Sequence, residues 1–233
     1  VTAGGVLTQN QEVGGGNDTV IATLTSTAGS IDSNADISAA TVTVRAAEDI
    51  NTATAILART GALTIDAGDD FDATGTLTAS TANVDIDAQT GHVNITSAVL
   101  AQTDVTVDAG DDITLANSAT ATTGDLTIAS GGDISADVLS SVTGTTNVTA
   151  DGDLAFTNTV TADIITGNAG LTLTTDEVLT ADIGAITLTA GTDATLGAGG
   201  AVTSNGTNGN VVISAGNNLT QTGSITSAVD INL

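Results

Sequence analysis

Short runs of alternating apolar and polar residues recur along the chain, each followed by a tight turn and a second run. The stretch DVTVDAGDDITL (104–115) shows the unit, in which Val105 and Val107 alternate with polar residues before an acidic turn. Nearly the same phrase occurs earlier as ALTIDAGDDF (62–71) and later as DLTIASGGDI (125–134). Alternation with a period of two is typical of half-buried strands, whereas an amphipathic helix needs apolar residues at i, i+3 and i+4. The pattern therefore predicts short strands joined by turns.

The phrase repeats with a period of about 21 residues, which indicates a solenoid. If the second apolar residue of each phrase is taken as a marker, the markers are Val44, Ile65, Ile86, Val107, Ile128, Val148, Leu173, Leu188, Ile213 and Leu233. The numbers of successive markers differ by 21, 21, 21, 21, 20, 25, 15, 25 and 20. The L-x-x-L-x-L-x-x-N pattern of leucine-rich repeats is absent. The 25, 15, 25 passage predicts a phase disturbance over about residues 162–185.

These periodicities predict an all-β fold, a right-handed parallel β-helix (β-solenoid) with about 21 residues and three short strands per coil. Residues 1–233 are interpreted as a single segment and as an excerpt of a longer repeat protein, with an irregular start over 1–19 and about ten to eleven coils over 20–233. At about 4.8 Å per coil, the rod would be on the order of 50 Å long. A closed antiparallel barrel also has alternating strands, but it predicts hairpin loops and strands of varied character.

The turns carry their own columns of residues. Small residues follow each marker by two positions, as at Ala67 and Ala109, and suit an inward bend where side chains stack on their own copies. The glycines beside that column, such as Gly68 and Gly110, are expected to adopt left-handed backbone angles. An Asp or Asn before the next strand, such as Asp112, is expected to bond its own backbone and close the turn.

The charge is one-sided, because 27 acidic residues stand against Arg45 and Arg59 and the net charge is −25. Such a charge repels nucleic acid and anionic lipid, so we expect no nucleic-acid partner. No run of about 18 apolar residues occurs, and we expect no membrane insertion. We also expect no enzyme activity: the acids lie in periodic columns, basic and aromatic side chains are scarce, and no long insertion could wall a cleft. A polysaccharide-acting β-helix enzyme remains the least favoured alternative.

One outward column carries acids in three consecutive coils, Asp66, Asp87 and Asp108. Carboxylates about 5 Å apart repel one another, and Ca²⁺, which favours several oxygen ligands, could bridge them. These residues are the candidate metal site, for a structural Ca²⁺, and the alternative is a solvated acidic ladder screened by salt. Acidic turns such as 69–70 are a second candidate, although turn closure is the simpler role there. No catalytic or cofactor-binding residue is predicted, and His92 is expected in a solvent-exposed bulge.

The phrases VTVDAGDDITL (105–115), LTIASGGDI (126–134) and VVISAGNNLTQ (211–221) resemble the repeats of filamentous-haemagglutinin-type exoproteins. The resemblance covers about residues 20–233. It implies a β-helical fold and a large secreted bacterial adhesin of the kind commonly exported by two-partner secretion, and similar repeats occur in autotransporter passengers. The secretion domain and signature motifs of that family do not occur in these residues. The heavy acidity and the lack of lysine also depart from its pattern.

Together, these features predict a structural or adhesive stalk segment of a large secreted bacterial surface or fibre protein, which presents or spaces a binding region. The expected location is extracellular, at the bacterial cell surface. Expected partners are the adjoining coils of the parent chain, further copies by end-to-end or lateral self-association, and a host or cell-surface glycan or receptor. Two alternatives stay open: a binding module whose flank recognises such a glycan, and a self-assembling filament or sheath subunit with cation-bridged acidic faces.

Overall fold

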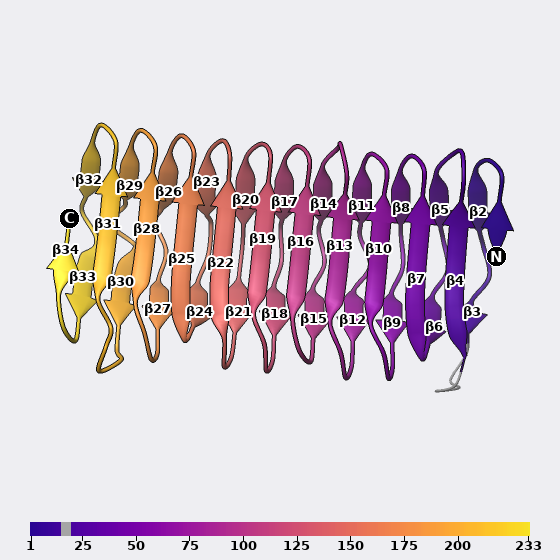
Figure 1. Cartoon of the computed structure of the whole chain (residues 1–233), viewed down its shortest axis with the longest axis horizontal. Coiled ribbons are helices and arrows are strands. Elements are labelled where there is room, and N and C mark those ends of the chain that lie inside the picture. The colour runs from indigo at the N-terminus through magenta and orange to yellow at the C-terminus, as the bar shows by residue number, and fades with distance from the viewer. Residues whose placement is uncertain (15–19) are drawn as a thin grey trace.

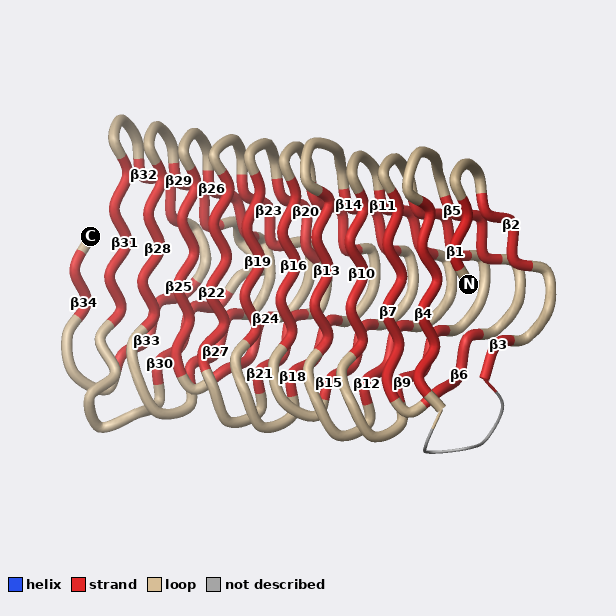
Figure 2. The backbone as a smooth tube through the Cα atoms, turned by 45° about the vertical axis from the view of Figure 1, so that its right-hand side comes forward, coloured by secondary structure: helices blue, strands red, loops and turns tan. Residues whose placement is uncertain are grey.

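The structure, a computed structural model, describes residues 1–14 and 20–233 and confirms the predicted all-β solenoid. In these ranges, strands and turns build three parallel sheets of 12, 11 and 11 strands, without any helix. Figure 1 shows the strands of the front sheet running upward, the loops passing over the top to the back, and the chain advancing from right to left, which is a right-handed winding. The tube in Figure 2 shows the coils stacked side by side along a straight rod.

Each coil adds one strand to each sheet, so every third strand belongs to the same sheet. Sheet A, at the front in Figure 1, contains β1 (Thr2–Ala3), β4 (Ile21–Ser26), β7 (Thr41–Ala46), β10 (Leu63–Ala67), β13 (Val84–Ala88), β16 (Val105–Ala109), β19 (Leu126–Ser130), β22 (Thr145–Ala150), β25 (Ile164–Ala169), β28 (Ile186–Ala190), β31 (Val211–Ala215) and β34 (Ile231–Asn232). Its strands from β4 to β31 are the longest of the structure, with five or six residues each, and they carry the candidate acidic column.

Sheets B and C are the other two sheets of the solenoid. Sheet B contains β2 (Leu7–Gln9), β5 (Ile31–Ser33), β8 (Ile50–Thr52), β11 (Phe71–Ala73), β14 (Val93–Ile95), β17 (Ile113–Leu115), β20 (Ile134–Ala136), β23 (Leu154–Phe156), β26 (Leu173–Thr175), β29 (Ala194–Leu196) and β32 (Leu219–Gln221). Sheet C contains β3 (Val13–Gly14), β6 (Ile37–Ala39), β9 (Ile56–Ala58), β12 (Leu77–Ala79), β15 (Val99–Ala101), β18 (Ala119–Ala121), β21 (Leu139–Ser141), β24 (Val160–Ala162), β27 (Leu179–Ala181), β30 (Ala201–Ser204) and β33 (Ser224–Ser227).

The register between coils places each residue opposite the equivalent residue of the next coil. In sheet A, Val105, Val107 and Ala109 lie opposite Leu126, Ile128 and Ser130 of the next coil. The inward positions are buried and form a continuous hydrophobic core from Ala22 to Ile213. Burying one such Val, Leu or Ile side chain contributes about 1.5–3 kcal/mol, so each coil is stabilised mainly by its two neighbours.

The glycines at the turn after sheet A serve a different purpose from the predicted one. The described residues have a positive φ at Gly14 alone, so Gly68 and Gly110 do not adopt left-handed angles. A Cβ atom added at Gly68 would collide with the backbone carbonyl of Ala47 in the preceding coil, and one at Gly110 would collide with that of Gln89. Glycine is therefore required because backbones of successive coils approach closely at this bend.

The irregular passage predicted over 162–185 has another origin. The marker column in β25 is occupied by Gly167, which lies opposite Val148 on one side and Leu188 on the other. Leu173, which the periodicity takes as a marker, lies in β26 of sheet B. A glycine does not register as the apolar member of an alternating run, so the sequence pattern passes on to the next leucine. With Gly167 restored to the column, the coils on both sides of it stay close to the common period.

The start of the chain also differs from the predicted irregular segment over 1–19. Within residues 1–14, β1, β2 and β3 form a coil that pairs with β4, β5 and β6. Residues 15–19, the rest of that predicted segment, lie outside the described residues.

Candidate functional site

The predicted site residues Asp66, Asp87 and Asp108 lie next to one another in register on β10, β13 and β16, on the outer face of sheet A. Their partners differ. Arg45 Nε lies 3.3 Å from one carboxylate oxygen of Asp66, and Gln89 Nε2 donates a 2.9 Å hydrogen bond to the other. Asp66 is therefore compensated by a cation and an amide, whereas Asp87 has a carboxylate on each side.

The pKa values of Asp87 and Asp108 are both raised in the folded chain. Partial burial raises the pKa of Asp87 above its ordinary value, and the charges of Asp66, Asp108 and Asp85 raise it further. Partial burial, followed by the charge of Asp85, raises the pKa of Asp108. A raised pKa means that the folded chain binds protons more tightly than the unfolded chain does. The ionised column therefore lowers the stability of the fold.

Replacing Asp87 with asparagine is expected to stabilise the chain at neutral pH by about 0.2–1 kcal/mol, because two in-register like-charge contacts disappear. The wild type should lose stability as the pH rises from 3.8, the ordinary value of the carboxyl, through the raised folded pKa, and the variant should lose less. Urea unfolding at several pH values measures both effects. Asp66→Asn is the matched control, and it should give no stabilisation because it removes the Arg45 contact. Equal stabilisation by both variants would contradict this assignment.

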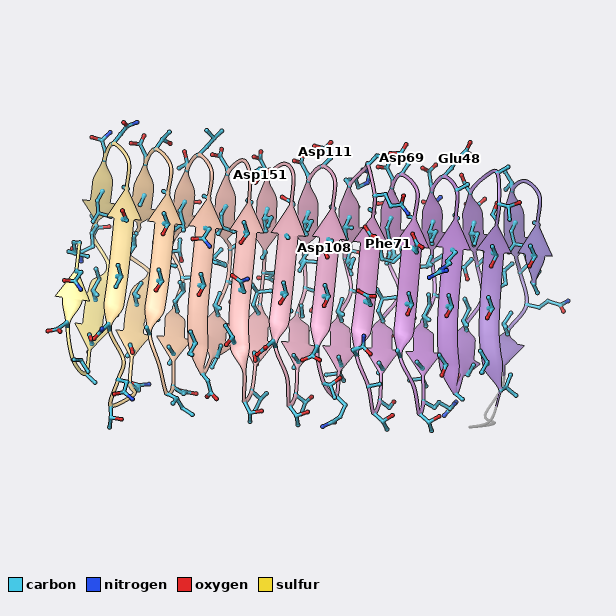
Figure 3. All side chains as sticks on the ribbon, viewed as in Figure 1. Glu48, Asp69, Phe71, Asp108, Asp111 and Asp151 are labelled. Atoms are coloured by element: carbon cyan, nitrogen blue, oxygen red, sulfur yellow. The ribbon has the colours of Figure 1, made fainter. Side chains whose placement is uncertain are left out.

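A longer array of acids follows the edge where sheet A turns into sheet B. Figure 3 shows the labelled Glu48, Asp69, Asp111 and Asp151 along this upper edge of the rod. The position just before each sheet B strand is also acidic in most coils, and these residues are Asp49, Asp70, Asp112, Asp133, Asp153 and Asp193. We call these six residues the turn ladder.

The turn ladder joins coils instead of closing single turns, which corrects the role predicted for Asp112. The backbone N–H of Asp133 donates a 2.7 Å hydrogen bond to Oδ1 of Asp112 in the preceding coil. In the same way, Asp153 donates to Asp133 at 2.7 Å, and Thr172 donates to Asp153 at 2.8 Å. Each carboxylate thus accepts the amide that the next turn leaves without a sheet partner, which offsets part of the repulsion along the ladder.

Glycine makes these bonds geometrically accessible. A Cβ atom on Gly132 would meet Oδ1 of Asp112, and one on Gly152 would meet Oδ1 of Asp133. The sequence pairs GD at 132–133 and at 152–153 therefore supply space for the lower carboxylate and an amide for it to accept. This signal was present in the sequence, since glycine directly precedes the ladder acid in these two repeats.

Replacing Asp133 with alanine is expected to cost about 1 kcal/mol of unfolding free energy, since the Asp153 amide loses its acceptor. Asp133→Asn keeps an acceptor oxygen and removes one charge from the ladder, so its stability should stay near that of the wild type. Chemical unfolding of the two variants side by side measures the difference. Equal losses would mean that the carboxylate charge, and not its acceptor oxygen, joins the coils.

The structure brings together a group of acids that sequence reasoning assigned to turn closure. Carboxylate oxygens of Asp49, Asp69 and Asp70 lie within 4.8 Å of one another. His92 lies beside this group, with Nδ1 2.9 Å from Oδ1 of Asp70 and Nε2 3.5 Å from Oδ1 of Asp72. Instead of a free bulge, His92 is a half-exposed partner of two acids. Carboxylate oxygens are the ligands that calcium favours, and among the described residues Asp49, Asp69 and Asp70 are the three acids whose oxygens lie close enough to share a cation, whereas Asp66, Asp87 and Asp108 are not grouped in this way.

The outer face of sheet B shows how the chain relieves charge elsewhere. In four successive coils one column reads Asp32, Asn51, Asp72 and Asn94. Asn51 donates to Asp32 at 3.2 Å, and Asn94 donates to Asp72 at 2.9 Å. Because aspartate and asparagine alternate, no two of these carboxylates are in-register neighbours. The acids of sheet A lack that spacing, so Asp87 has a carboxylate neighbour in both adjacent coils.

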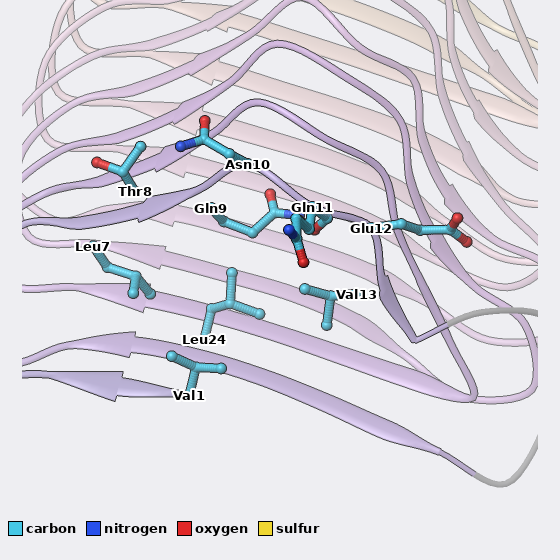
Figure 4. A pocket seen from close by; sticks show the side chains of 9 residues that line it. All are labelled: Val1, Leu7, Thr8, Gln9, Asn10, Gln11, Glu12, Val13 and Leu24. Atoms are coloured by element: carbon cyan, nitrogen blue, oxygen red, sulfur yellow. The ribbon is translucent and has the colours of Figure 1, made fainter.

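A hollow of about 420 Å³ lies at the N-terminal end of the rod. Figure 4 shows Leu7, Val13 and Leu24 around it, with Gln9 and Gln11 at its upper side. The apolar residues belong to inward columns of the first two coils, so the hollow is the uncovered end of the core. Among the described residues that line it, Glu12 is the one acid, and these residues offer no pair of carboxylates for acid–base chemistry.

The described residues include no helix that could span a membrane. Comparisons with protein-family models, with curated proteins and with solved structures give no match.

Proposed function

We propose that this chain is a rigid spacer, a stalk segment of a large secreted bacterial surface or fibre protein that presents or separates a binding region elsewhere in the molecule. The observation that carries the proposal is the core, which continues through successive coils from Ala22 to Ile213. A continuous core couples each coil to the next and resists bending, as a spacer requires. The resemblance of the repeats to filamentous-haemagglutinin-type exoproteins supports the extracellular setting.

The distribution of acids supports a role without catalysis. The turn ladder uses its carboxylates to accept backbone amides of the next coil, and Asp66 is held by Arg45 and Gln89. The hydrogen bonds of the turn ladder recur from coil to coil, as structural groups do. A hydrolase instead needs two carboxylates set apart in a cleft, one with a raised pKa.

The spacer proposal is tested by measuring the length of the rod under force and its binding to glycans and cells in separate experiments. The chain is applied to glycan arrays and cultured cells, and single molecules are pulled from their ends. A spacer shows no saturable binding and a constant length until cooperative unfolding. Saturable binding to one glycan, abolished by substitutions on one flank, would instead identify a binding module.

A filament or sheath subunit with calcium-bridged acidic faces is the second candidate. It is favoured by the grouping of Asp49, Asp69 and Asp70 and by the uncompensated charge at Asp87. Calcium that bridges these groups would raise the melting temperature and assemble filaments that disperse in chelator, as electron microscopy would show. Loss of the calcium effect in Asp69→Asn would place the ion at the turn, and loss in Asp87→Asn would place it on sheet A. An unchanged melting temperature in wild type would rule this candidate out.

A further inference from the structure

The outer face of sheet C differs in charge from the rest of the rod. The described strands of sheet C contain no charged residue, whereas sheets A and B carry acids on their outer faces, such as Asp87 and Asp72. Figure 2 shows the strands of sheet C in one row along the rod. Because the chain has a net charge of −25, this is the face on which another acidic molecule meets the least repulsion.

The same face exposes apolar side chains. Leu100, the outward residue of β15, is 44% exposed. Val142, directly after β21, is 55% exposed, and Val178, directly before β27, is 38% exposed. A surface that lacks charge and exposes apolar side chains has the composition of the core of a protein–protein interface.

Alternation gives each coil three outward positions on this side, one on the strand and one on either side of it. In four successive coils these positions are Thr76, Thr78 and Ser80, then Ala98, Leu100 and Gln102, then Ser118, Thr120 and Thr122, then Val138, Ser140 and Val142. We call these twelve residues the neutral face. It is built on β12, β15, β18 and β21, so it belongs to the middle of the rod.

Opposite charges lie on the two sides of the neutral face. Arg59 directly follows β9, its Nε donates a 3.1 Å hydrogen bond to the Ser38 hydroxyl, and it forms no ion pair among the described residues. Six coils further along, the exposed Asp182 directly follows β27 at the equivalent position. Both residues lie at the same edge of sheet C. A second copy turned end for end can therefore place its Asp182 over Arg59, and its Arg59 over Asp182.

A twofold axis along β18 makes this match for the whole face. In sheet C, β18 lies midway between β9 and β27, so the axis also places β15 of one copy over β21 of the other. Leu100 then lies over the smaller Ser140. Val138 and Val142 flank Ser140 on either side, so Leu100 enters a gap with apolar walls. The symmetry repeats this contact a second time, as in other isologous interfaces.

A second copy also matches the spacing of the face. Coils repeat at about 4.8 Å in both copies, so the rows of side chains stay in phase along the contact, which a partner with another spacing does not offer. Seven coils at about 4.8 Å and five residues at about 3.3 Å give a face of roughly 500 Å² per copy. The total of about 1,000 Å² lies at the lower limit of specific interfaces, so we expect a weak dimer.

We propose that two copies of this chain bind each other through sheet C, with their rods antiparallel about a twofold axis along β18 and with Arg59 of each copy paired with Asp182 of the other. The contact joins the same surface of both copies, so it closes as a dimer. It leaves the acidic arrays of sheet A and of the turns facing solvent and needs no cation. The inference does not depend on the spacer function.

Sedimentation velocity of the wild-type chain tests the association. The dimer is expected to increase with protein concentration and with NaCl, because salt screens the repulsion between chains of charge −25. A chelator should leave the dimer unchanged, which separates this contact from cation-bridged assembly. A chain that stays monomeric at every concentration and salt level, or a dimer that chelator disperses, would overturn the proposal.

Two variants of equal charge locate the contact. Leu100→Asp should weaken the dimer at least about tenfold, because it places a carboxylate inside the contact. Thr114→Asp adds the same charge on the outer face of β17 in sheet B, and in high salt it should leave the affinity within about twofold of the wild type. Circular dichroism checks that both variants fold. Equal weakening by the two variants would show that sheet C is not the interface.

An exchange of charges tests the orientation. Arg59→Asp and Asp182→Arg should each weaken the dimer by roughly tenfold, since each brings like charges together twice. The double variant restores opposite pairs and should regain the wild-type affinity. Arg59→Asp with Asp163→Arg has the same net charge, but its arginine lies one coil away and should not restore binding. Because Arg59 and Asp182 lie six coils apart in one chain, rescue requires contact between copies. Equal affinity of the two double variants would refute the twofold arrangement.

Discussion

Phe156→Ala is expected to lower the free energy of unfolding by about 3–5 kcal/mol, because a fully enclosed ring leaves a cavity. Phe156 is 2% exposed, in β23 between Ala136 and Thr175 of the neighbouring coils. Across the interior, a Cβ atom on Gly167 would lie 3.2 Å from this ring and 3.1 Å from Leu188. The large ring thus occupies the space that a side chain in the marker column of β25 would otherwise fill.

The same geometry predicts that the effects on stability of substitutions at Phe156 and at Gly167 are strongly coupled. Gly167→Leu alone should overpack the core and cost about 1–3 kcal/mol. The double variant Phe156→Ala with Gly167→Leu should be more stable than the sum of the single losses predicts, by at least about 1 kcal/mol. A cycle of Phe71→Ala with Gly167→Leu is the matched control, since Phe71 lies several coils away and its effect should add. Chemical unfolding measures the wild type and every variant of both cycles, and additivity at Phe156 would refute this packing.

Removing one whole coil is expected to leave the fold intact. Deletion of residues 84–104 joins Asn83 to Val105, which occupies the same sheet position as Val84 in the next coil. Every sheet then loses one strand, and the neighbours meet in the same register. The free energy of unfolding should fall by roughly the contribution of one coil, since in solenoids this free energy is close to a sum over neighbouring units.

Removing part of a coil should have a much larger effect. Deletion of residues 92–104 takes away β14 and β15 but retains β13, so sheets B and C are one strand short at a level where sheet A is complete. The core on either side of the gap is exposed. We expect loss of the single cooperative transition in thermal unfolding followed by circular dichroism. Similar melting curves for the two deletions would show that the coil is not the structural unit.

Much of this fold can be predicted from the sequence, because residues of similar type recur at the same position of each coil. Val107, Ala109 and the acidic turn that follows occupy positions that recur once per coil, and the structure places each on its own copy. The column of Asp66, Asp87 and Asp108 followed from the same count. A period converts directly into three-dimensional neighbours when the coils are stacked in register.

The remainder depends on contacts between coils that a linear pattern does not contain. Gly167 is in a core column only because Phe156 fills the space opposite it. Asp112 accepts a hydrogen bond from the backbone amide of Asp133 in the next coil, and local turn rules consider only its own backbone. The glycines of the bends are explained by the backbone of the preceding coil, not by their φ angles. The contacts of His92 with Asp70 and Asp72 also join two successive coils, so the local sequence around His92 does not reveal them.

Distances between spin labels along one outward column give the most direct test that each coil lies in register on its predecessor. Thr43, Thr127, Thr166 and Thr187 share a column of sheet A, and the chain has no cysteine to interfere with labelling at introduced cysteines. Pulsed electron paramagnetic resonance should give distances of about 19, 29 and 34 Å from a label at position 43 to labels at positions 127, 166 and 187, which corresponds to about 4.8 Å per coil. Distances that fail to grow in proportion to the number of coils, as in a meander of hairpins or a closed barrel, would contradict the stacked solenoid.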